Sequence, residues 1–200
     1  MNWNDCLLEY SKEHPECIVY GSDYQSGTND SLSMIVSTEQ GPILLQQEVR
    51  SYGRGTSVKE CAMLKIRLNT SYELIVKKQN LIKKGWDLIS PTYIHFNQTD
   101  FKKKYAVRSN HPEYTKLALG ELEWMQFMLK QNRLSVCVCP VEKKGIDHTI
   151  IVYHSDEFYD ELLATKKEED TIIWNMVECC KVTYWALSRF KIEDEEIELV

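Results

Sequence analysis

Alternation of apolar and polar side chains is the feature that most constrains the fold of this chain. Between residues 61 and 68 every second residue is aliphatic, and the last two intervening positions are Lys65 and Arg67. Three further runs of the same kind occur between residues 31 and 77. Successive side chains of a strand point to opposite faces, and an antiparallel sheet can expose one face to water. The first part of the chain is therefore predicted to be a largely antiparallel sheet.

A helical period replaces this alternation after residue 110. Apolar residues from Tyr114 to Leu129 recur at steps of three and four, Asn110 is a suitable N-cap, and Pro112 falls in the first turn. We therefore expect one continuous helix from about residue 111 to 130. Its partners for packing must come from the strands on either side.

Further elements complete the pattern. Residues 4–14 predict a short opening helix, 92–96 and 104–109 two short strands, and 133–141 and 149–154 a pair of strands. A short helix is expected at about 156–164 and a long helix at about 169–189. Strands and helices follow one another in blocks, without a repeating βαβ unit, so the pattern favours an α+β fold with helices packed on one face of the sheet. The second half is expected to run β-α-β-β-α.

The chain is predicted to be one domain, residues 1–200. It has 200 residues, no internal repeat and no linker rich in Pro, Gly or Ser. Within that domain we distinguish a sheet-rich half at about 15–109, a β-α-β-β-α half at about 101–190, and an acidic tail at 191–200.

Charge is distributed unevenly. The net charge is −6, yet residues 59–108 hold eleven Lys and Arg against four acids, whereas residues 156–200 hold thirteen acids against five bases. A solvated sheet face and an acidic tail explain these counts, and a surface for an anionic ligand is the alternative. A nucleic-acid partner is not favoured, because such proteins are usually basic overall.

The expected compartment is the cytoplasm. The chain begins without the basic and apolar stretches of a signal peptide, no apolar run is long enough to span a membrane, and the seven cysteines are an odd number in a long chain. Free thiols are therefore expected. No motif for a nucleotide, cofactor or metal is present, so no cofactor is predicted.

A polar loop is the densest group of side-chain donors and acceptors. It follows a short strand at 17–21, and the turn at 53–55 adds a guanidinium between two glycines. Loops of this composition carry binding sites in many proteins, although they also simply join strands. The candidate ligand-binding residues are Asp23, Tyr24, Ser26, Thr28, Asn29 and Arg54.

Cysteines and histidines occur together at the second predicted pair of strands. Cys137 and Cys139 share one face of the first strand, and His148 and His154 flank the second. Burial as ordinary core thiols is the simpler interpretation. The alternatives are a weak metal site from these four residues, or a thiol nucleophile with a histidine base.

The segment from Asp100 to Ser109, followed by a helix, a pair of strands and Asp156-Glu157-Phe158, resembles the layout of bacterial conserved domains of unknown function. The resemblance covers the second half only. It implies a fold relative without an assigned activity, so no residue role is carried over from it.

These observations predict a non-catalytic binding or accessory protein of the bacterial cytosol that contacts a protein or small molecule. An enzyme that uses a Cys/His pair is the first alternative. Nucleic-acid or other anion binding through the basic middle segment is the second. Edge strands of an antiparallel sheet leave dimerisation open.

Overall fold

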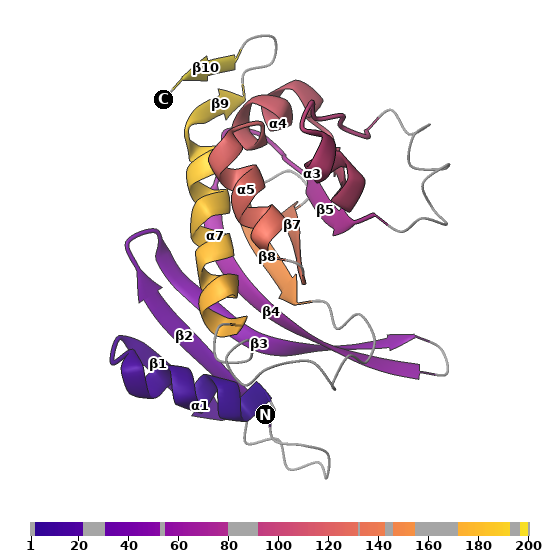
Figure 1. Ribbon diagram of the computed structural model, residues 1–200. Coiled ribbons are helices and arrows are strands. Elements are labelled where there is room, and N and C mark those ends of the chain that lie inside the picture. The colour runs from indigo at the N-terminus through magenta and orange to yellow at the C-terminus, as the bar shows by residue number, and fades with distance from the viewer. Residues whose placement is uncertain are drawn as a thin grey trace.

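An α+β fold built on one large antiparallel sheet confirms the predicted fold class (Figure 1). The computed structural model describes residues 3–21, 31–52, 55–79, 92–131, 133–142, 146–154, 172–192 and 197–199. The helices are α1 (Trp3–Glu13), α3 (Thr99–Lys104), α4 (Pro112–Leu119), α5 (Leu122–Lys130) and α7 (Ile172–Ser188). The strands of the large sheet are β1 (Cys17–Gly21), β2 (Leu32–Thr38), β3 (Gly41–Tyr52), β4 (Gly55–Arg67), β5 (Leu74–Lys78), β6 (Tyr105–Ser109), β7 (Leu134–Pro140) and β8 (Asp147–His154).

The order of the strands merges the two halves of the chain into one sheet. The eight strands run β1-β2-β3-β4-β8-β7-β5-β6, and every neighbouring pair is antiparallel. Strands β8 and β7, from the second half, lie between β4 and β5 of the first half. The two halves therefore share one hydrophobic core, which includes residues from α1, the sheet and α7.

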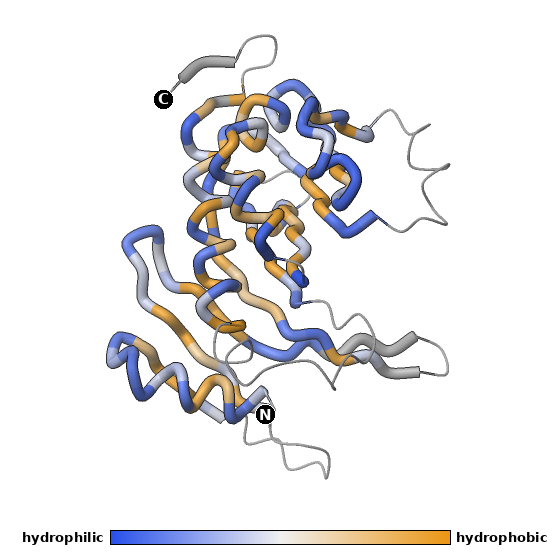
Figure 2. The backbone as a smooth tube through the Cα atoms, viewed as in Figure 1, coloured by the Kyte–Doolittle hydropathy of each residue, from blue (hydrophilic) through white to orange (hydrophobic). Residues whose placement is uncertain are grey.

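The helices lie on one face of the sheet, as the sequence predicts. Helix α7 crosses β4 and β8, α1 packs on β1 and β2, and α3 and α4 pack beside β6 (Figure 1). In β4 the alternation is visible directly, because Ala62, Leu64 and Ile66 are buried under the helices whereas Lys65 and Arg67 are exposed. Hydrophobic positions, orange in Figure 2, gather in α7 and in the strands that it crosses.

The helix predicted to run from 111 to 130 is instead two helices, α4 and α5, which break at Gly120. A Cβ atom at Gly120 would lie 2.1 Å from the carbonyl oxygen of Lys116, so only glycine permits this close approach. Asn110 is not the N-cap; that position is His111. The Asn110 side chain accepts a hydrogen bond from the backbone N–H of Glu73 at 2.7 Å, and so joins β6 to the start of β5.

Three other elements differ from expectation. Helix α3 immediately precedes β6 and has no counterpart in the predicted pattern. Residues 92–96 form only an isolated bridge, Tyr93 to Arg108, rather than a strand. The expected acidic tail contributes to a two-stranded sheet of β9 (Phe190–Ile192) and β10 (Ile197–Leu199). The helix predicted at 156–164 lies outside the described residues.

None of the described helices combines the length and the apolar character that crossing a membrane requires.

Candidate functional site

The candidate thiols and histidines of β7 and β8 are on opposite faces of the sheet. Cys137 pairs with Ile151 and Cys139 with Thr149, so both thiols share the face of those residues. His148 and His154 lie at the alternate positions of β8, and both are buried on the face that the helices cover. The sheet itself therefore separates the sulfur atoms from the imidazoles, and neither the metal site nor the Cys/His nucleophile is brought together.

His148 has a structural role that occupies both ring nitrogens. Its side chain is fully buried. The backbone N–H of Tyr72 donates to Nε2 at 2.9 Å, and Nδ1 lies 2.8 Å from the carbonyl oxygen of Ile146. This pattern corresponds to a neutral imidazole that donates from Nδ1 and accepts at Nε2. His148 thus ties the segment before β5 to the start of β8 and has no nitrogen left for a metal or a substrate.

His154 is held by a carboxylate instead. Its Nδ1 lies 3.2 Å from Oε2 of Glu60, on the neighbouring strand β4, and its side chain is only 5% exposed. The Glu60 side chain lies on the helix-covered face of the sheet, as His154 does. His154 therefore places its imidazole beside a carboxylate of the neighbouring strand, at the end of β8.

The thiols are in two different environments. Cys179 and Cys180 are completely buried in α7, and burial raises the pKa of Cys179 to about 12. Cys137 and Cys139 are half-buried on the other face of the sheet, so they are not core thiols. Burial also raises the pKa of the Cys139 thiol, which disfavours the reactive thiolate. The described residues contain no group of three or more His, Cys, Asp or Glu side chains placed to hold a metal ion.

The predicted loop site cannot be placed. Asp23, Tyr24, Ser26, Thr28, Asn29 and Arg54 all lie outside the described residues.

The face of the sheet opposite the helices, here called the open face, carries a continuous band of apolar residues. In every strand of the large sheet except β6, the register places one apolar residue directly beside an apolar residue of the next strand. This band, here called the apolar row, consists of Ile18, Ile35, Leu44, Met63, Ile151, Cys137 and Ile75. It crosses seven of the eight strands and ends beside Arg108 of β6.

The apolar row is partly accessible to solvent along its length. Ile18 at one end is 62% exposed and Ile75 near the other is 37% exposed, and the five residues between them are half-buried. None of the described helices covers this face. Contiguous apolar surface that none of the described helices and strands covers is typical of an interaction site.

Basic side chains flank the apolar row. The open face carries three acids, Glu48 and Asp147 on its strands and Glu73 just before β5, against the five bases Lys59, Lys65, Arg67, Lys77 and Arg108. Arg67 lies 3.9 Å from Asp147 with both side chains about three-quarters exposed, which is a weak pair in water. Lys65 and Lys77 have no ion pair within the described chain. The open face is thus positive on a chain whose net charge is −6.

Aromatic side chains are few on this face. Tyr153 lies beside the apolar row, and the Nζ atom of Lys59 is 5.8 Å from the centre of its ring. Tyr20 of β1 also lies on this face and has an exposed side chain. The chemistry of the surface is therefore aliphatic and cationic, which suits an apolar ridge flanked by carboxylates.

A signal for this surface is present in the sequence. The positions that alternate with the core residues of β4 are predicted to face water, yet Met63 is apolar. Ile35, Leu44 and Ile151 likewise stand next to core residues of their strands. Each taken alone is an ordinary surface residue. Only the register shows that they form one row.

Comparisons with known proteins give no family for this chain. No protein-family model, no curated protein and no solved structure matches it.

Proposed function

We propose that this protein is a non-catalytic, cytosolic binding protein that docks an acidic partner protein on the open face of its sheet. The apolar row and its basic flanks carry this proposal. Apolar contact supplies the affinity, and the uncompensated lysines favour a partner with carboxylates around its apolar residues. None of the seven cysteines, all of them among the described residues, forms a disulfide bond, which fits a reducing compartment.

A protein partner accounts for the surface better than a nucleic acid does. Nucleic-acid surfaces of this type use aromatic side chains on which bases stack. The centre of the open face is occupied by aliphatic side chains instead, and three other lysines of the basic middle segment, Lys102 to Lys104, lie on α3. The basic residues that the structure describes are thus divided between the sheet and a helix rather than forming a single phosphate-binding track.

A second copy of the chain fits the open face less well. Two open faces brought together would oppose positive charge to positive charge around the apolar row. An acidic partner removes this repulsion. For this reason we propose a different protein rather than a homodimer as the occupant.

The test uses a defined probe. A synthetic amphipathic peptide with leucine on one face and glutamate beside it is labelled, and its fluorescence anisotropy is followed as protein is added. A peptide with lysine in place of glutamate is the charge control. We expect the acidic peptide to bind, with weaker binding at higher salt, and the basic peptide not to bind.

Variants locate the binding on the open face. Met63→Glu places a charge in the apolar row and should weaken binding at least about tenfold. The double variant K65E/K77E should weaken it about fivefold. Leu117→Glu, on the exposed surface of α4, and the double variant K102E/K103E, on α3, are the matched controls and should leave affinity unchanged.

The proposal fails if the acidic peptide does not bind, if the basic peptide binds equally, or if the control variants weaken binding as much as Met63→Glu. Binding of single-stranded DNA that is lost in K65E/K77E would assign the face to nucleic acid. Self-association of the protein, abolished by Met63→Glu in sedimentation equilibrium, would assign it to a second copy.

A further inference from the structure

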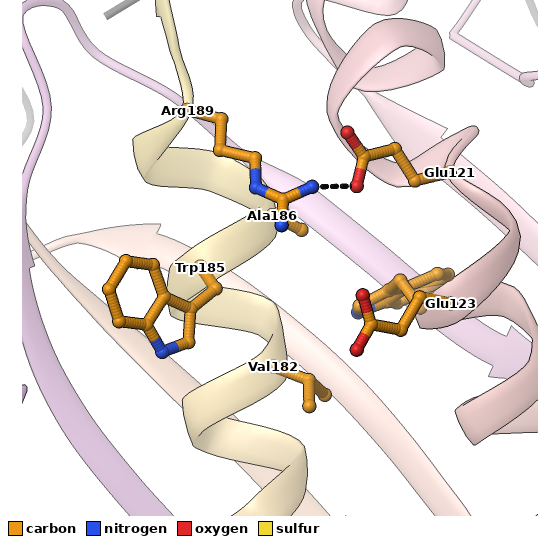
Figure 3. A pocket seen from close by; sticks show the side chains of 7 residues that line it. Glu121, Glu123, Val182, Trp185, Ala186 and Arg189 are labelled. Carbon is orange, nitrogen blue, oxygen red and sulfur yellow. Dashed lines mark hydrogen bonds and ion pairs between the residues drawn. The ribbon is translucent and has the colours of Figure 1, made fainter.

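A pocket of about 350 Å³ lies on the helix side of the molecule, between the start of α5 and the end of α7 (Figure 3). It belongs neither to the open face nor to the β7/β8 hairpin. Its volume is at the lower end of the range for small-ligand sites. The pocket therefore suits a single functional group with a short stem rather than a large cofactor.

The floor of this pocket is rigid and apolar. Trp124 is only 2% exposed, and its Nε1 donates a hydrogen bond to Oγ1 of Thr183 at 3.1 Å. Ala186 of α7 is buried next to it. Because these groups are already packed and hydrogen-bonded, a ligand would meet a surface that does not have to rearrange.

The rim contrasts with the floor because it exposes a large aromatic ring. Trp185 is 51% exposed, and its ring meets the ring of Tyr184 edge to face, with the centroids 6.1 Å apart. Figure 3 shows Trp185 on one side of the pocket and Glu123 on the other, with Val182 between them. An exposed tryptophan beside a cavity is a surface that a ligand can cover.

The charges of the lining favour a cation. Arg189 forms an ion pair with Glu121, so the one guanidinium of the pocket is already engaged. Glu123 has neither an ion pair nor a hydrogen bond within the described part of the chain. Its place in the first turn of α5 explains why a carboxylate is tolerated there, but not why it faces an exposed indole across a pocket.

We propose that this pocket binds an alkylammonium group. The cation lies between the Glu123 carboxylate and the face of the Trp185 indole, where a carboxylate and a ring quadrupole both attract it. The alkyl stem lies on Trp124 and Val182. A lysine side chain of a partner protein and a free polyamine share this chemistry, and the experiment separates the two.

The probes are 1,5-diaminopentane for the free amine and a short peptide with one central lysine for the protein side chain. Binding is followed by isothermal titration calorimetry and by the indole N–H signals in nuclear magnetic resonance. We expect a dissociation constant of about 1 mM or tighter for at least one probe, with a shift of the Trp185 signal. The neutral alcohol 1-pentanol should not bind.

Matched variants test the two recognition groups. Glu123→Gln and Trp185→Leu should each weaken binding about fivefold. Glu113→Gln changes the equivalent first-turn acid of α4, and Trp174→Leu changes a tryptophan of α7 that is 46% exposed outside the pocket. Both controls should bind as the unchanged protein does.

Binding of the diamine alone would identify a small-molecule site, and binding of the peptide alone would identify a protein side chain. The inference is overturned if neither probe shifts the Trp185 signal at millimolar concentration, if 1-pentanol binds equally, or if Glu123→Gln and Trp185→Leu have no effect. Because the pocket and the open face are on opposite sides of the sheet, this test is independent of the peptide experiment.

Discussion

The two faces of the sheet use similar residues for different purposes. Ile150 and Ile151 are neighbours in β8, yet Ile150 is fully buried under α7 and Ile151 stands in the apolar row. Leu64 and Met63 of β4 differ in the same way. Hydrophobic character alone therefore does not identify the core face of a strand. What distinguishes the faces is which one the helices cover.

Thiol reactivity should show the largest contrast between the faces. Iodoacetamide reaches Cys179 and Cys180 only when the helix side opens, and burial holds the pKa of both thiols above its ordinary value. Cys137, half-buried on the open face, should therefore react at least about 100-fold faster than either. Mass-spectrometric mapping under native conditions measures the three rates, with denatured protein as the control. Equal native rates would contradict the assignment of the faces.

Alanine substitution of the two neighbouring isoleucines compares the faces at one point of one strand. Ile150→Ala should lower the free energy of unfolding by about 2–5 kcal/mol, because it leaves a cavity in the core. Ile151→Ala should cost about 1 kcal/mol or less. Urea denaturation followed by circular dichroism measures both. A larger loss for Ile151→Ala would mean that the open face is covered.

Replacement of His148 tests a polar link on the helix-covered face. His148→Phe leaves the buried N–H of Tyr72 without an acceptor, which should cost about 1–3 kcal/mol of unfolding free energy. His148→Gln keeps a hydrogen-bond acceptor and should lose less. Thermal or urea unfolding measures the difference. Equal losses in both variants would show that packing, rather than the hydrogen bond, is what His148 provides.

Alkaline pH should destabilise the helix side through its buried tyrosines. Burial raises the pKa of Tyr72 and of Tyr114 above its ordinary value, so the folded state keeps a proton that the unfolded chain loses above about pH 10. The contribution of the two protonated tyrosines to the free energy of unfolding is therefore complete below about pH 10, and it is lost as the pH rises toward the folded-state pKa.

The unchanged protein should therefore lose about 1 kcal/mol per buried tyrosine between neutral pH and about pH 10.5. Tyr114→Phe is less stable at neutral pH, since it lacks the hydrogen bond to the carbonyl oxygen of Leu187. Its further loss at alkaline pH should nevertheless be smaller by about 1 kcal/mol. Urea unfolding at both pH values provides the test, and an identical alkaline loss in the variant would contradict it.

Much of the local structure follows from the sequence. The alternation around β4 and the three-and-four spacing of α7 report side-chain directions that depend only on neighbouring residues. Predictions fail where a distant group decides the outcome. Asn110 has the side chain of an N-cap, but the backbone of Glu73 offers it another partner, and Gly120 ends α4 in the middle of a regular helical pattern.

The candidate surfaces show the same division. Sequence reasoning grouped Cys137 and Cys139 with His148 and His154 because they are close along the chain, whereas β7 and β8 present them to opposite sides. The apolar row joins residues as distant as Ile18 and Ile151, whose alignment requires the pairing of β1 through β8. No local sequence pattern shows which strands pair or in which register.

By itself, the sequence determined that this chain forms an α+β fold with an antiparallel sheet and helices on one face, because local periodicity records which side chains must be buried together. Tertiary structure alone decided that β7 and β8 insert between β4 and β5, and that the apolar residues of the other face align in one row. The physical reason is that strand pairing joins backbone groups far apart in the chain, and any strand offers the same hydrogen-bonding groups to any neighbour. The choice among neighbours depends on the packing of the whole core.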